Sequence, residues 1–77
     1  MRDTRKLRGD INQILNPMIR DGIIAGFRTN LFGGEPPDEV VVTVTAPEAD
    51  DFDITWQKVS RALEAIPVDV LVRVDLP

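Results

Sequence analysis

Apolar residues in the first part of the chain recur at the spacing of one helix face. Between residues 4 and 20 they follow one another at intervals of one, three or four positions: Leu7, Ile11, Ile14, Leu15, Met18 and Ile19. This pattern predicts an amphipathic helix. The dipeptide Asp21-Gly22 predicts where the helix ends, because glycine adopts the left-handed conformation of a helix C-cap without steric cost.

Pro17 lies in the last turn of this predicted helix. It has no N–H to donate to the carbonyl of Gln13, and it disfavours helical backbone angles at Asn16. We therefore expect the helix to kink or break at Asn16, with Pro17 opening a final turn. The alternative is a functional kink that aims the following strand at a neighbouring subunit.

Two strands joined by a turn are predicted next. Apolar and polar positions alternate from Ile23 to Leu31, as in a half-buried strand. Gly33-Gly34 and Pro36-Pro37 predict a turn rather than a phosphate-binding loop, because the GxGxxG pattern and a Walker lysine are missing. The β-branched run from Glu39 to Thr45 predicts the second strand of a hairpin. Its register stays open, with Val41 on one face and Val40, Val42 and Val44 on the other.

A second helix is predicted by apolar residues three or four positions apart: Trp56, Val59, Leu63 and Ile66. We expect Trp56 to anchor the core. Asp50, Asp51 and Asp53 come at the start of this helix, where carboxylates accept hydrogen bonds from free N–H groups and complement the helix dipole. We interpret them as capping residues. The alternative, a calcium or magnesium loop, lacks the glycine and the distal glutamate of an EF-hand.

Alternation from Val68 to Asp75 predicts a last strand and completes an α-β-β-α-β order. A chain of 77 residues supports one core, so the predicted fold class is α+β, with residues 1–77 forming a single small domain. We expect a three-stranded mixed sheet with both helices on one face. The last strand should run parallel to the second, on the far side of the first, and both sheet edges should be open to strand addition. The other face would carry Arg28, Asn30, Asp69, Leu71, Arg73 and Asp75.

Charge is distributed unevenly along the sequence. The net charge is −4, yet four of the nine basic residues lie in the first eight positions, namely Arg2, Arg5, Lys6 and Arg8. Seven acids and no base lie between residues 35 and 53. The two groups predict either two solvated patches or the complementary faces of a head-to-tail assembly. The acidic balance argues against nucleic acid as a partner, so we expect residues 1–5 to form a first helical turn or a flexible basic arm.

Histidine, cysteine and tyrosine are missing from the chain. Because these residues supply most general bases, nucleophiles and metal ligands, the sequence predicts a protein that is not an enzyme and that holds no metal or cofactor. No apolar run approaches the roughly 20 residues that span a bilayer, so no membrane partner is expected. The polar first residues are not followed by the apolar core of a signal peptide, which predicts a cytoplasmic location.

A family resemblance is carried by the run Ile11-Asn-x-x-Leu15-Asn-Pro-Met-Ile19-x-x-Gly-x-Ile24-x-Gly-Phe-Arg28. Followed by a polar turn and a strand rich in Val and Thr, it resembles the C-terminal domain of contractile phage tail sheath proteins. In that family a helix ending in a glycine leads into a strand of the domain's sheet, and a hairpin partner follows. The resemblance covers about the first 45 residues. It implies a subunit of a phage or phage-like tail, such as a sheath, baseplate or terminator protein, located in the host cytoplasm or in the virion.

These features together predict a structural assembly subunit. It would associate with copies of itself or with other tail subunits, through its sheet edges and its oppositely charged ends. The candidate interaction residues are Arg2, Arg5, Lys6, Arg8, Arg28, Asp50, Asp51, Asp53 and Arg73. The alternative is a small regulatory module that binds a peptide along an edge strand, or nucleic acid through the basic residues near the N-terminus.

Overall fold

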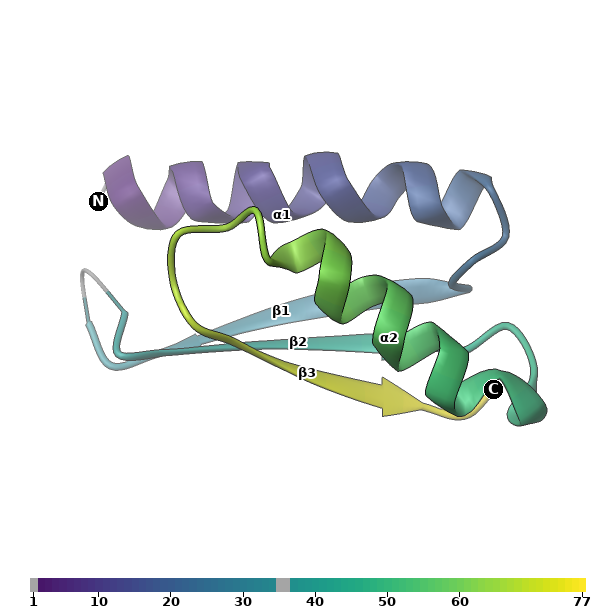
Figure 1. The fold of residues 1–77 in the computed structure, drawn as a ribbon. Coiled ribbons are helices and arrows are strands. Elements are labelled where there is room, and N and C mark those ends of the chain that lie inside the picture. Colours follow the sequence, from purple (N-terminus) through teal and green to yellow (C-terminus); the bar gives the residue numbers. More distant parts are fainter. Residues whose placement is uncertain (1, 35–36) are drawn as a thin grey trace.

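A computed structural model describes residues 2–34 and 37–77, with the side chains of residues 2–4 left out. Its elements follow the order α-β-β-α-β, as predicted from the sequence (Figure 1). They are α1 (Arg2–Arg20), β1 (Gly26–Phe32), β2 (Glu39–Thr45), α2 (Phe52–Leu63) and β3 (Val70–Asp75). A short 3-10 turn, η1 (Ala49–Asp51), comes directly before α2. Since α1 begins at Arg2, residues 2–5 lie in its first turn.

The three strands form a mixed sheet with β2 in the centre. The β1 and β2 strands pair antiparallel as a hairpin, and β2 pairs parallel with β3. The parallel direction of β3 is confirmed, but its predicted place beyond β1 is wrong. The reason lies in β2, where Val40 to Val44 are all buried. A strand buried on both faces is most stable between two neighbours, and the β2-α2-β3 crossover returns the chain directly to its free side.

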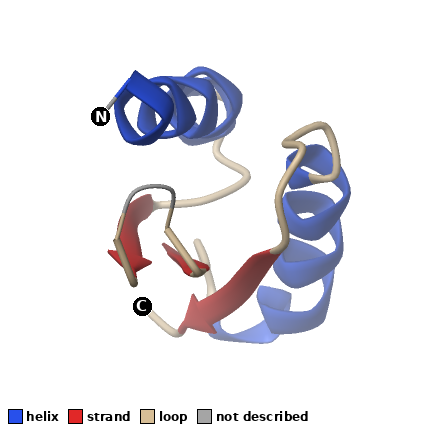
Figure 2. Ribbon diagram, turned by 90° about the vertical axis from the view of Figure 1, so that its left-hand side faces the viewer, coloured by secondary structure: helices blue, strands red, loops and turns tan. Residues whose placement is uncertain are grey.

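The core lies between the sheet and the two helices, which both cover the same sheet face (Figure 2). Leu7, Ile11 and Leu15 of α1 meet Val59 and Leu63 of α2 over one face of the sheet. This face also carries Val40, Val42 and Val44, which settles the register that the sequence left open. Val41 points to the opposite face but is only 7% exposed, because β1 and β3 flank it on both sides.

The end of α1 is set by Gly22, as predicted. Gly22 has a positive φ of 77°, and the N–H of Ile23 donates to the Met18 carbonyl at 2.9 Å. The N–H of Ile24 also points back to Met18, at 3.4 Å. Because these two amides bond to the helix end, they are not available to a sheet ladder, and β1 begins at Gly26 rather than at Ile23.

Pro17 does not break the helix. The α1 helix continues through it to Arg20, and the carbonyl of Pro17 accepts a hydrogen bond from the Asp21 N–H at 2.9 Å. The expected break at Asn16 is therefore wrong. A proline this close to a helix end removes a single intrahelical bond, which the packing of the apolar face of α1 offsets.

Trp56 is not a core anchor, contrary to the prediction. It is 47% exposed, while the neighbouring Thr55 is 1% exposed and takes the buried position. The buried stripe of α2 therefore runs through Thr55, Val59 and Leu63, at intervals of four residues.

The acids before α2 provide no side-chain cap. Asp51 stands at the N-cap of α2 without a capping hydrogen bond from its side chain. Asp53 lies in the first helical turn, where a carboxylate complements the helix dipole. The predicted capping hydrogen bond is therefore wrong for Asp51. Asp53 lies where its carboxylate can interact favourably with the helix dipole, as predicted.

Candidate protein-interaction surface

The free edge of β3 is the central feature of the candidate surface. The carbonyl of Asp75 accepts a hydrogen bond from the Ala46 N–H, which follows β2, at 2.9 Å. Peptide groups alternate in direction along a strand, so Leu71 and Arg73 also point their N–H and C=O groups at β2. Val70 and Val72 then point theirs outward. We call the outward backbone groups of Val70 and Val72 the β3 edge; among the described residues no strand pairs with them.

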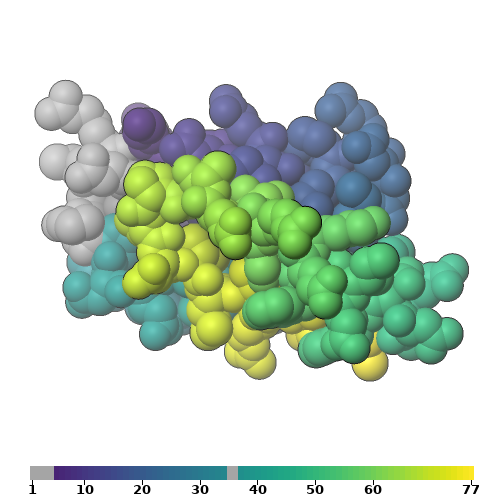
Figure 3. Space-filling view, viewed as in Figure 1, coloured from purple at the N-terminus to yellow at the C-terminus, as the bar shows by residue number. Residues whose placement is uncertain are grey.

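A hollow of about 280 Å³ adjoins the β3 edge. It lies between the C-terminal half of α2 and the beginning of β3, on the side of the molecule where Figure 3 shows atoms of β3 at the surface. Its lining combines apolar side chains with two acids: Ser60, Leu63, Glu64, Ile66, Val68, Asp69, Val70 and Val72. An extended chain laid along the β3 edge would border this space.

The hydroxyl of Ser60 has no hydrogen-bond partner within the described part of the chain, although its oxygen is fully covered. A covered polar atom without a partner costs about 1 to 3 kcal/mol. Ser60 lines the hollow, but its oxygen is covered and does not face a group that enters there. Nothing in the sequence pattern distinguished Ser60, because its surroundings depend on how α2 approaches β3.

Exposed apolar side chains lie around the β3 edge. Leu71 is 55% exposed and Val68 is 46% exposed. Trp56 precedes Ser60 by four residues, so it lies on the same side of α2 one turn away, and nearly half of its surface is accessible. Large exposed apolar and aromatic side chains are typical of protein-protein contacts.

The open sheet face carries the charged residues that alternation predicted for it. Arg28, Asn30, Leu71, Arg73 and Asp75 are all exposed, and Asp69 is exposed just before β3 begins. Arg28 and Arg73 both align with Thr43 of the central strand. The Arg28 guanidinium lies 3.9 Å from the Asp75 carboxylate. This ion pair is solvent-exposed and contributes little to stability, about 1 kcal/mol at most.

The other sheet edge, on β1, is partly covered. The Arg8 guanidinium of α1 reaches over the core and donates a hydrogen bond of 3.5 Å to the Thr29 carbonyl. A long cation across an edge strand is one of the ways in which proteins protect such edges from pairing. Arg8, a predicted interaction residue, is therefore engaged within its own chain.

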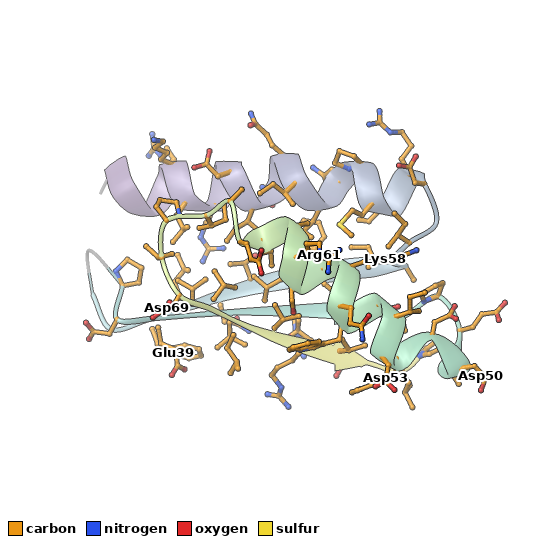
Figure 4. The ribbon with its side chains drawn as sticks, viewed as in Figure 1. Glu39, Asp50, Asp53, Lys58, Arg61 and Asp69 are labelled. Atoms are coloured by element: carbon orange, nitrogen blue, oxygen red, sulfur yellow. The ribbon has the colours of Figure 1, made fainter. Side chains whose placement is uncertain are left out.

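The charged clusters lie at different ends of an elongated molecule with dimensions of 37 × 20 × 18 Å. The exposed Arg5 and Lys6 lie in the first turns of α1, whereas Asp50 and Asp53 lie at the far end of the molecule, at the start of α2 (Figures 1 and 4). Asp51 lies between Asp50 and Asp53 in the sequence and is the last residue of η1. The side chain of Arg2 lies outside the described part.

The run of acids is divided by the fold. Glu39 lies near the end where α1 begins, opposite to Asp50 and Asp53 (Figure 4). Glu35 lies outside the described residues. The separation of charge along the sequence therefore translates only in part into a separation in space. Among the described residues, Arg5 and Lys6 do not meet Asp50 and Asp53 within one chain.

Neither a metal-binding cluster nor a membrane-spanning helix is formed by the described residues. Within residues 2–34 and 37–77, no group of three or more acidic, histidine or cysteine side chains is arranged to hold a metal ion. None of the described helices is long and apolar enough to cross a membrane.

Comparison with known proteins found no match among protein families, curated proteins or solved structures.

Proposed function

We propose that this protein is a non-catalytic structural assembly subunit that binds other copies of itself through the β3 edge. The observation that carries the proposal is the outward row of backbone groups at Val70 and Val72. This row lies beside exposed Leu71 and Val68, and beside a hollow with an unpartnered hydroxyl. An open edge of this kind favours the addition of a further strand.

The charged ends give the subunit a second means of contact. Arg5 and Lys6 at one end, and Asp50 and Asp53 at the other, are too far apart to meet within one chain but can meet between chains. Such contacts favour end-to-end arrangement and are screened beyond about 8 to 10 Å at physiological salt. The resemblance of residues 11–28 to tail sheath domains suggests a phage or phage-like contractile tail as the assembly.

The experiment is a measurement of mass by light scattering over a range of protein and salt concentrations, with negative-stain imaging of the largest species. We expect the wild type to form oligomers, and Leu71→Asp to lose them because it places a charge on the edge strand. The matched control is Phe32→Asp, since Phe32 is 52% exposed on the same sheet face but belongs to β1.

High salt separates the two kinds of contact. Association along the edge persists at 1 M salt because it depends on backbone hydrogen bonds and apolar burial, whereas end-to-end contacts are lost. Equal masses for the wild type and Leu71→Asp at every concentration would contradict an assembly role for the β3 edge.

A second candidate function is the docking of a peptide from another protein along the same edge. The hollow beside the β3 edge favours it, because side chains of a docked peptide can enter the space lined by Leu63, Val68 and Val70. A chain that stays monomeric at all concentrations, yet binds strand-forming peptides selected from a random library and loses them on Leu71→Asp, would favour this function over self-assembly.

A further inference from the structure

The sequence around Leu71 is symmetric in its apolar pattern and complementary in its charge. Residues 68–74 read Val-Asp-Val-Leu-Val-Arg-Val, with Leu71 in the middle. On reversal about Leu71, four valines exchange with one another in two pairs, and the remaining pair consists of Asp69 and Arg73. A strand with this pattern is complementary to a second copy of itself that runs in the opposite direction.

We propose that the β3 edge pairs with β3 of a second copy, antiparallel and about a two-fold axis through Leu71. This inference rests on the proposed function and specifies its partner and register. The axis places Leu71 of each copy opposite Leu71 of the other. It also places Val70 opposite Val72, and Asp69 opposite Arg73, twice each.

The backbone geometry fits this register. Val70 and Val72 both point their N–H and C=O groups outward, so opposite each other they form the hydrogen-bonded pairs of an antiparallel ladder. Leu71 bonds to β2 within its own chain and therefore occupies the closer, non-hydrogen-bonded position. An axis perpendicular to the sheet also keeps the faces matched: the valines of both copies stay on the helix-covered face, and Leu71 stays on the open face.

Two neighbouring registers are less favourable. An axis through Arg73 would bring two arginines together, and an axis through Val72 would oppose Asp69 to Asp75. Both place like charges directly across the strands, which is destabilising. An axis through Leu71 instead sets the acidic end of β3, where Glu39 lies near Asp69, against Arg73 of the second copy (Figure 4).

The surroundings of the edge suit the same segment. The hollow between α2 and β3 is lined by Val70 and Val72, the two residues whose backbone groups would pair with the second copy. Pairing covers Leu71 and Val68, which are about half exposed in the single chain. The β1 edge, where Arg8 bonds to Thr29, stays on the outside of the resulting two-fold dimer.

The first experiment is a site-specific disulfide. Because the chain has no cysteine, Leu71→Cys introduces a single thiol on the proposed axis. In a non-hydrogen-bonded antiparallel pair the two Cα atoms lie about 4.5 Å apart, within the range of about 4.4 to 6.8 Å that a disulfide requires. We expect mild oxidation to convert most of this variant to covalent dimer. Phe32→Cys, equally exposed on β1, should stay largely monomeric.

The second experiment exchanges the charges. Asp69→Arg alone and Arg73→Asp alone each place like charges opposite one another twice, and each should raise the dimer dissociation constant by about tenfold or more. An equimolar mixture of the two variants restores both opposite-charge pairs. We therefore expect the mixture to form heterodimers with nearly the wild-type constant, and the double variant Asp69→Arg/Arg73→Asp to dimerise like the wild type.

The outcomes separate this inference from the proposed function. If Leu71→Asp abolishes association but the mixed charge variants fail to recover it, the edge is used in another register, and only the inference is overturned. The same holds if oxidised Leu71→Cys and Phe32→Cys give equal amounts of dimer while Leu71→Asp stays monomeric. If Leu71→Asp changes no association at all, the proposed function falls as well.

Discussion

Pro17 shows how a helix tolerates a residue that opposes it. It lies in the last turn of α1, so the only backbone bond it removes is the one toward Gln13. Its own carbonyl remains bonded to the Asp21 N–H at 2.9 Å. The burial of Ile11 and Leu15, both completely inaccessible to solvent, offsets the free energy lost with the missing hydrogen bond. Nothing in this arrangement requires a functional kink.

Replacement of Pro17 tests that conclusion. We expect Pro17→Ala to raise the free energy of unfolding by about 1 to 3 kcal/mol, because it restores one helical hydrogen bond and removes the clash of the ring. Urea denaturation measures the change, and light scattering should show unchanged association. A variant that is more stable but no longer assembles would support the functional kink instead.

Trp56 shows that apolar spacing alone does not identify the buried residue of a helix face. Its spacing to Val59 and Leu63 fits a helix face as well as that of Thr55 does, so the sequence pattern alone selects the more apolar residue. The packing of α2 onto the rest of the fold decides between them, and it buries Thr55. A large aromatic side chain is thereby left half exposed on α2.

The contrast between Trp56 and Leu63 gives a stability prediction. Leu63 is 3% exposed within the core, so Leu63→Ala should lower the free energy of unfolding by about 2 to 5 kcal/mol. Trp56→Ala should lower it by no more than about 1 kcal/mol, as is usual for exposed positions. Chemical denaturation of both variants at low protein concentration decides the matter. A larger loss for Trp56→Ala than for Leu63→Ala would place the tryptophan in the core after all.

At the scale of elements, local signals predicted what local interactions determine. The glycine stop of α1, the antiparallel pairing of β1 with β2 and the alternating faces of β1 and β3 each depend mainly on residues close in sequence, and the structure has them as expected. The same alternation placed Arg28 and Arg73 on the open sheet face. Strand order depends on contacts between residues far apart in the sequence, because the strand that gains most from two neighbours takes the centre. Here that strand is β2, whereas the sequence had placed β1 there. The hollow next to Ser60 forms between α2 and β3 and had no signal in either one.

The whole molecule combines an elongated shape with one covered and one free sheet edge. Arg8 crosses the β1 edge, while Val70 and Val72 point their backbone groups outward from β3. Pairing of two copies through β3 would produce one continuous sheet with the helices on one side. Such a dimer is a closed unit, and further growth would depend on the contacts between charged ends.

The most direct test of this account is hydrogen exchange of individual backbone amides, measured by NMR at low and at high protein concentration. Exchange of a strand-edge amide slows when a second strand pairs with it. We predict that the amides of Val70 and Val72 exchange quickly in dilute protein and become protected as concentration rises. The amides of Leu71 and Arg73, already bonded to β2, should be protected at both concentrations. Association accompanied by new protection on β1, with Val70 and Val72 still exchanging quickly, would contradict the account.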